Sequence, residues 1–301
     1  MIILDELAFA EDMSKKGFIK TFSIYELSIY AKWRRYLDSK KEDAEIEKEL
    51  IEFSKKHNEN FIYEVDYPKI DKALQSIEDF RLRVPIPTYV TESEWDKIQS
   101  LDNIKHRKVM FVMLVVSKYY KHNDTRILKE GQKRNSKYDN VYFCNLSDAN
   151  IIKLAGVRFR DTSDRNKMFN MLYNKGFIDV TRGRRCTRIV KIVDNNDDAI
   201  EAVTDYHNII LYYDRLTGIN IGECEECGRL FRQNKNNTFK YCKEHRGYVP
   251  KGTKTIVCIE PDCGKEVVVD ARNMTKVRCD ECQKEHRKKW DRERKRKQKK
   301  L

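Results

Sequence analysis

Apolar residues recur three and four positions apart along the first quarter of the chain, which is the spacing of one face of an α-helix. The stretch SIYELSIYAKWRRYLD, at 23–38, has this pattern and opens on a serine suited to cap a helix. The segments at 43–57 and 67–80 continue it. The next segment, at 83–94, contains two closely spaced prolines and therefore cannot be helical along its whole length. We therefore predict a helical N-terminal domain over residues 1–90.

The pattern changes repeatedly between residues 91 and 220. KHRKVMFVMLVVSKYYKH, at 105–122, predicts a buried helix, and VYFCNL, at 141–146, predicts a short strand. FIDVTRGRRCTRIVKIV, at 177–193, predicts two strands joined by a turn. The last segment, DAIEAVTDYHNIILYYDRLTG at 198–218, is interpreted as one amphipathic helix that ends at its glycine.

Two short helices are expected between the first strand and the hairpin. SDANIIKLAG begins at Ser147 as its N-cap and stops at Gly156. TSDRNKMFNMLYNKG repeats this order, with Thr162 or Ser163 as the cap and Gly176 as the stop. The sequence thus places two helices, joined by a short turn, directly before a hairpin.

This order of elements resembles the winged helix-turn-helix domain. In that family the second helix of the motif enters the major groove of DNA, and the hairpin wing touches the backbone or the minor groove. The resemblance implies a winged-helix domain with a trailing helix over residues 91–220.

Seven of the nine cysteines lie near the C-terminus, six of them in three pairs, and the seventh, Cys242, stands three residues before His245. A cysteine pair with a short gap turns both sulfurs toward one point, and four such ligands suit a structural zinc ion. Glycines 228 and 264 follow the second cysteine of a first pair, where positive φ is tolerated. Two sets of ligands result: Cys224, Cys227, Cys242 and His245, then Cys258, Cys263, Cys279 and Cys282.

Both sets resemble treble-clef or zinc-ribbon fingers. They imply a first zinc module at 221–250 and a second at 251–301 that ends in a basic helix. His286 competes with His245 for completion of the first site. Cys144 and Cys186 lie outside both sets and are expected to be small core residues. The expected fold is therefore mainly α with small β elements, and two structural Zn²⁺ ions are its expected cofactors.

Charge is uneven along the 301 residues, whose net charge is +13. Residues 1–100 hold 16 Lys and Arg against 21 Asp and Glu, whereas residues 101–200 hold 21 against 11. A basic surplus of this size favours a polyanionic partner, usually nucleic acid. The acidic N-terminal domain is expected to bind a protein partner or to support a homodimer.

The candidate nucleic-acid contacts fall in two groups. In the winged-helix segment, side chains that suit base edges and phosphates lie in the turn, the second helix and the wing; they are Arg158, Arg160, Arg165, Asn166, Lys167, Asn170, Arg182, Arg184, Arg185 and Arg188. The tail at 284–300 holds 11 Lys and Arg against three acids and suits sequence-blind phosphate binding. Its candidates are Arg287, Lys288, Trp290 and Arg294.

The sequence lacks recognisable signals of export, membrane insertion or catalysis. Its longest apolar run, at 109–116, is too short to span a bilayer, and its start lacks a basic segment followed by a long apolar one. We expect a soluble cytoplasmic protein with no membrane association. The near-match to a phosphate-binding loop at 247–255 has the wrong spacing, and we predict no enzyme activity.

The combination of a helical start, a winged helix and C-terminal cysteine fingers resembles uncharacterised proteins of bacteriophages and prophages of low-GC Gram-positive bacteria. The resemblance implies a role in phage gene control, replication or host takeover. Our first hypothesis is a protein that binds double-stranded DNA, as a transcription regulator or replication accessory. Two alternatives stay open: an effector that binds a host protein such as RNA polymerase or a defence nuclease, and an RNA-binding protein.

Overall fold

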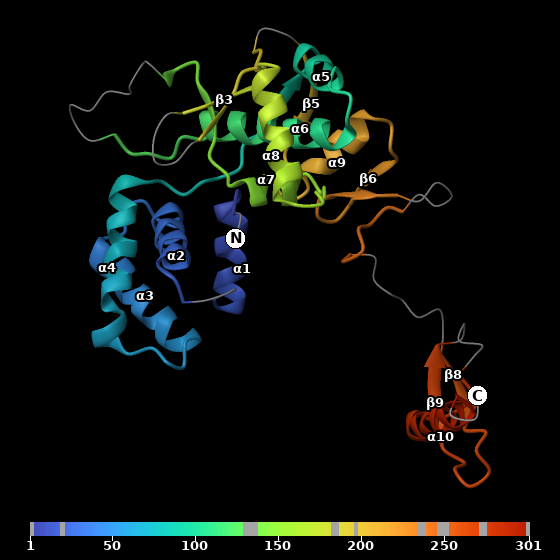
Figure 1. Ribbon diagram of the computed structural model, residues 1–301. Coiled ribbons are helices and arrows are strands. Elements are labelled where there is room, and N and C mark those ends of the chain that lie inside the picture. The colour runs from blue at the N-terminus through green and yellow to red at the C-terminus, as the bar shows by residue number, and fades with distance from the viewer. Residues whose placement is uncertain are drawn as a thin grey trace. The chain divides into compact units, whose positions relative to one another are not determined.

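The computed structural model describes residues 3–18, 22–128, 138–181, 187–195, 198–233, 239–245, 253–270 and 276–298. The chain divides into two compact units, Met1–Phe239 and Lys240–Leu301 (Figure 1). Helices dominate, and the strands form small antiparallel sheets. The expected class, mainly α with small β, is confirmed.

The N-terminal helices share a core of their own. They are α1 (Glu6–Lys16), α2 (Ile24–Leu37), α3 (Asp43–His57) and α4 (Tyr63–Asp79). Apolar side chains at helical spacing on one face of each helix form this core, which includes Leu27, Ile46, Leu50, Ile70 and Ile77. The observed α4 begins one turn before the expected start at 67, and Pro68 lies inside it.

The second core of this unit is built around one long helix. The central α6 (Ile104–His122) is buried from Val109 to Tyr119, which confirms the buried helix expected at 105–122. α5 (Glu92–Gln99) precedes it and packs against it. Glu94 of α5 is fully buried, and its Oε1 accepts a hydrogen bond from Lys118 Nζ of α6 at 2.9 Å.

A three-stranded antiparallel sheet and two short helices cover part of α6. β2 (Tyr142–Cys144) precedes α7 (Asp148–Leu154) and α8 (Thr162–Asn174), and β3 (Ile178–Val180) and β4 (Arg188–Val190) follow them. The strand order is β2-β4-β3, with Cys144 and Val180 both opposite Arg188. The last strand in sequence therefore lies in the middle of the sheet.

Local capping chemistry sets the ends of these helices. Ser147 caps α7 as expected, whereas α8 is capped by Asp161, which accepts a hydrogen bond from Asp164 N at 2.8 Å. The expected cap at Thr162 or Ser163 is therefore wrong. Glycines 156 and 176 have φ of +61° and +75°, as the expected helix stops require.

The interpretation of 198–218 as one helix is wrong. Its first half is β5 (Ala199–Val203), which pairs antiparallel with β1 (Thr88–Thr91), and only α9 (Ile209–Leu216) is helical. The Tyr212 hydroxyl accepts hydrogen bonds from Thr204 N at 3.1 Å and Asp205 N at 2.8 Å, and these bonds fix the turn between β5 and α9. The backbone of β1, more than one hundred positions away, provides the pairing that turns this half into a strand.

A two-stranded ribbon follows α9 in the same unit. It consists of β6 (Ile221–Glu223) and β7 (Leu230–Arg232), and Leu230 is buried in the core around α6. The second unit contains β8 (Thr253–Val257), its antiparallel partner β9 (Glu266–Asp270) and α10 (Asp280–Gln298). Among the described helices, none has both the length and the apolar composition that crossing a bilayer requires.

Candidate metal centres and basic surfaces

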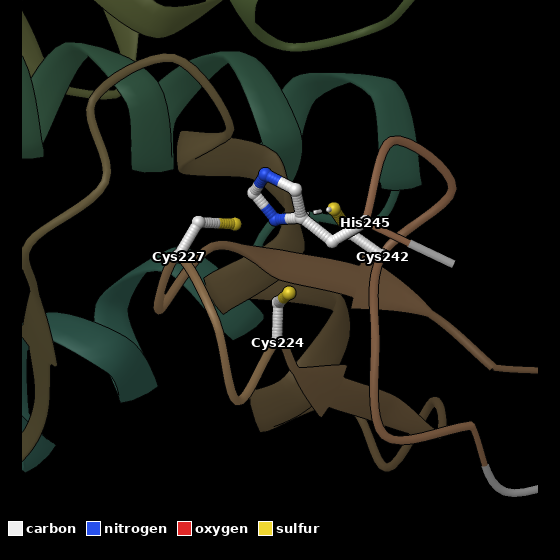
Figure 2. A group of neighbouring side chains, drawn as sticks. All are labelled: Cys224, Cys227, Cys242 and His245. Atoms are coloured by element: carbon white, nitrogen blue, oxygen red, sulfur yellow. Dashed lines mark hydrogen bonds between the residues drawn. The ribbon is translucent and has the colours of Figure 1, made fainter. Parts of the chain in front are cut away.

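Four side chains of the first cysteine module converge on one point. Cys224 and Cys227 lie between β6 and β7, and Cys242 and His245 follow β7 along the chain. Figure 2 shows the four side chains gathered around a common centre, and their ligand atoms lie within 4.8 Å of one another. Cys224 and Cys242 are buried, and the other two are partly buried. The expected first ligand set is therefore brought together and could hold a metal ion.

The backbone turns sharply at each opening cysteine pair. Gly228 N donates to Cys224 O at 2.8 Å, and Cys224 N donates to Arg229 O at 3.0 Å. Gly228 and Gly264 have φ of +67° and +55°, the left-handed region that other residues rarely adopt. The glycine after each pair is thus a requirement of the turn that aims the two sulfurs.

The second cluster is built by residues of the second unit alone. Its ligand atoms also lie within 4.8 Å of one another, and it consists of Cys258, Cys263, Cys279 and Cys282. Cys258 and Cys279 are buried. Cys279 begins the last knuckle, from which α10 continues. His286 of α10 belongs to neither cluster, so the first set is completed by His245.

The spacing of the donor atoms fits a tetrahedral ion. Cys242 Sγ and His245 Nδ1 are 3.7 Å apart, and Cys263 Sγ and Cys279 Sγ are 3.6 Å apart. A zinc ion with bonds of about 2.3 Å to sulfur and about 2.0 Å to nitrogen would separate such donors by about 3.5 to 3.8 Å. Both clusters therefore have the donor types that a tetrahedral metal needs, and the one pair of donor atoms compared in each cluster has a suitable spacing.

Backbone hydrogen bonds favour the metal-binding form of one thiol. Cys279 N donates to Cys258 Sγ at 3.4 Å, and this bond is the largest influence that lowers the pKa of the Cys258 thiol to about 7. A thiolate is the form of cysteine that binds metal. The Cys258 thiol therefore loses its proton more readily near neutral pH than an ordinary cysteine does.

The outer face of α8 presents several of the expected nucleic-acid contacts. Asn166, Lys167 and Asn170 are exposed, whereas Met168 and Leu172 are buried. Tyr173, which is 52% exposed, and Asn174 lie on the same face. The sequence reasoning missed these two, although Asn174 stands four positions after Asn170, the spacing of one helix face.

Arg165 is placed differently from its neighbours on α8. Its side chain is partly buried, and its Nε is enclosed without a hydrogen bond to the described residues. Arg158 and Arg160, in the turn before α8, are exposed. Arg160 Nε lies 3.2 Å from Asp161 Oδ2, and Lys105 Nζ donates to Arg158 O at 2.9 Å.

Arg188 is engaged inside its own domain. Its guanidinium donates to both carboxylate oxygens of Asp148, with Nη2 2.9 Å from Oδ2, and lies over the Phe169 ring, 3.8 Å from the centroid. These contacts fasten β4 to α7 and α8. The other wing candidates, Arg182, Arg184 and Arg185, lie outside the described residues.

The basic tail continues the last knuckle as α10. Arg287, Lys288 and Trp290 are exposed on this helix, and the side chain of Arg294 lies outside the described part of the chain. Between the first turn of α10 and Arg292, none of the described side chains is buried. The cationic groups of these residues therefore face solvent.

Comparisons of the chain with models of protein families, with curated proteins and with solved structures found no match in any of the three.

Proposed function

We propose that the protein binds double-stranded DNA through a winged helix formed by α6, β2, α7, α8, β3 and β4. The observation that carries the proposal is the coincidence of two features of α8. It stands directly before a hairpin whose last strand is central in the β2-β4-β3 sheet, and its outer face is polar and free of acids between Asn166 and Asn174. The position before the hairpin supports a role for α8 as the recognition helix, and the polar face supports contact with base edges and phosphates.

We further propose that both Cys/His clusters hold zinc in closed structural sites. Cysteine and histidine in tetrahedral sets are the ligands that zinc prefers, and four protein ligands leave no position open for catalysis. The first ion would anchor the β6–β7 ribbon, and the second would fix the knuckle from which α10 starts. The basic surface of α10 would then add affinity for phosphates without sequence preference.

A binding assay with a matched control tests the DNA proposal. Zinc-loaded full-length protein should retain a labelled DNA duplex, and Arg158→Glu with Lys167→Glu should weaken retention at least about tenfold, because like charge repels phosphates. Lys48→Glu, a charge reversal on exposed α3, should leave it nearly unchanged. Stronger retention of structured RNA than of duplex DNA would contradict the proposal and favour the RNA alternative.

A second candidate function is binding of a host protein by the N-terminal helices, as an effector would require. The start of α4 exposes three large apolar side chains, Ile62 at 55%, Tyr63 at 43% and Val65 at 67%. Exposed apolar residues in a group favour a protein interface. A complex recovered from host lysate should survive nuclease and high salt and should be lost in Ile62→Ser with Val65→Ser.

A further inference from the structure

The exposed side chains of α8 after its first turn form one uniform surface. They are Asn166, Lys167, Asn170, Tyr173 and Asn174. At 3.6 residues per turn they occupy about a third of the helix circumference, with Asn170 near the centre. We call these five residues the α8 face. Each can donate a hydrogen bond, and none is acidic.

This composition differs from that of an ordinary solvent-facing helix in the same protein. The exposed side of α3 carries Glu45, Lys48, Glu52 and Lys55, a mixture of charges on good helix formers. The α8 face has three asparagines, which are weaker helix formers than glutamate or lysine. Exposed positions are free to hold the better helix formers, so the amides favour a role in recognition.

The position of Arg165 narrows what this face can recognise. An arginine reads guanine by presenting two donors to O6 and N7, and asparagine reads adenine by pairing with N6 and N7. Arg165, the one arginine on α8, is partly buried with its Nε enclosed. The face therefore offers amides at its centre and a single lysine, Lys167, at its edge.

We propose that Asn166 and Asn170 read adenine in the major groove, so that the preferred site holds two A·T pairs. This inference rests on the proposed function. The two residues are about 6 Å apart along the helix axis, close to two base steps of about 3.4 Å. Asn166 lies in the N-terminal half of α8, the part of a recognition helix that contacts base edges, and Asn170 lies one helical turn further along the same face. Duplex RNA does not fit, because its deep, narrow major groove excludes side chains.

Selection from a random duplex library with zinc-loaded full-length protein tests the preference. The expected site has adenine enriched at two positions separated by about one base pair. Asn170→Ala should remove the enrichment at one position and keep the other. Asn60→Ala changes an exposed asparagine before α4 and should keep both. Asn170→Arg should shift the affected position toward guanine.

Replacement of one selected adenine by 7-deazaadenine tests the contact itself, because it removes the N7 acceptor. Wild-type binding should fall about fivefold or more. At the position read by Asn170, the Asn170→Ala variant should show no further loss.

The outcomes separate the two levels of the proposal. A protein that retains duplex DNA but selects guanine, selects no base, or keeps its preference in both asparagine variants overturns adenine reading and leaves DNA binding intact. A protein that retains no duplex at all overturns the proposed function and this inference together.

Discussion

Asp214 joins three elements through one buried carboxylate. It lies on α9 with its side chain fully buried; its Oδ1 accepts from Lys108 Nζ of α6 at 2.9 Å, and its Oδ2 accepts from Arg232 Nε of β7 at 3.0 Å. A buried carboxylate is stable as an anion only with such partners. The ribbon that carries Cys224 and Cys227 is therefore tied to the core of the first unit by a charge as well as by Leu230.

Asp214→Asn should lower the free energy of unfolding by about 2 to 3 kcal/mol, because it leaves two cations facing a neutral group. The loss is smaller than for a wholly enclosed pair, since the Arg232 side chain is 58% exposed. Urea unfolding followed by circular dichroism measures it. Asp102→Asn, at a 96% exposed carboxylate paired with Lys175, is the control and should change stability by less than about 0.5 kcal/mol. Equal unfolding midpoints for the two variants would contradict this account.

Cys144 should be unreactive in the folded protein. Burial in the apolar core raises the pKa of its thiol to about 12, and only a thiolate reacts with alkylating reagents. Peptide mapping by mass spectrometry after iodoacetamide treatment at pH 8 should find Cys144 modified only when the protein is first denatured. Rapid modification in native protein would mean that β2 opens to solvent.

At the scale of elements, the sequence predicted best what local chemistry decides. Ser23 and Ser147 cap α2 and α7 because a serine oxygen reaches a backbone N–H three residues on, which depends on nothing distant. The strand at 199–203 was missed because its apolar pattern also fits a helix turn, and pairing with β1 decided between them.

The same limit applies to the candidate site. Cysteine spacing identified both clusters, because the ligands of each pair are neighbours in sequence. Helical spacing also placed Asn166 and Asn170 on an exposed face. Helical spacing did not show that the Nε of Arg165 is enclosed. Nor could it place Arg188, because its ion pair with Asp148 joins residues that are 40 positions apart in the chain.

The two clusters should differ in what their loss does to the first unit. Cys227→Ser disrupts the ribbon whose Leu230 and Arg232 contact the core around α6 and α9. The thermal unfolding midpoint of the first unit should therefore fall by about 2 °C or more. Cys263→Ser affects a cluster made only of second-unit residues and should leave that midpoint unchanged. Calorimetry measures the transitions, and native mass spectrometry should count one metal fewer in each variant. Identical calorimetric traces for both variants would show that the first metal adds nothing to the fold of its unit.

At the scale of the whole molecule, charge is distributed unevenly along the chain. Residues 1–100 carry more acids than bases, whereas the tail at 284–300 carries 11 Lys and Arg against three acids. The first region exposes apolar side chains at the start of α4, and the tail exposes cations along α10. The proposed division is therefore protein contact in the N-terminal helices, base reading by α8 and phosphate contact by α10.

The salt dependence of DNA binding tests the role of α10 within this division. Each cation that contacts a phosphate releases a counterion and adds about 0.9 to the slope of log affinity against log salt. Arg287→Ala with Lys288→Ala should therefore reduce the steepness of the slope by about two, with equal effect on all duplex sequences, because phosphates are alike.

Lys48→Ala with Lys55→Ala removes the same charge from exposed positions of α3 and should leave the slope unchanged. Asn170→Ala should instead alter the preferred sequence and keep the slope, since an amide releases no counterion. If the α10 variant keeps the wild-type slope, this helix contacts no phosphate and its charge serves another purpose; if the α3 variant changes it equally, the effect reflects net charge alone.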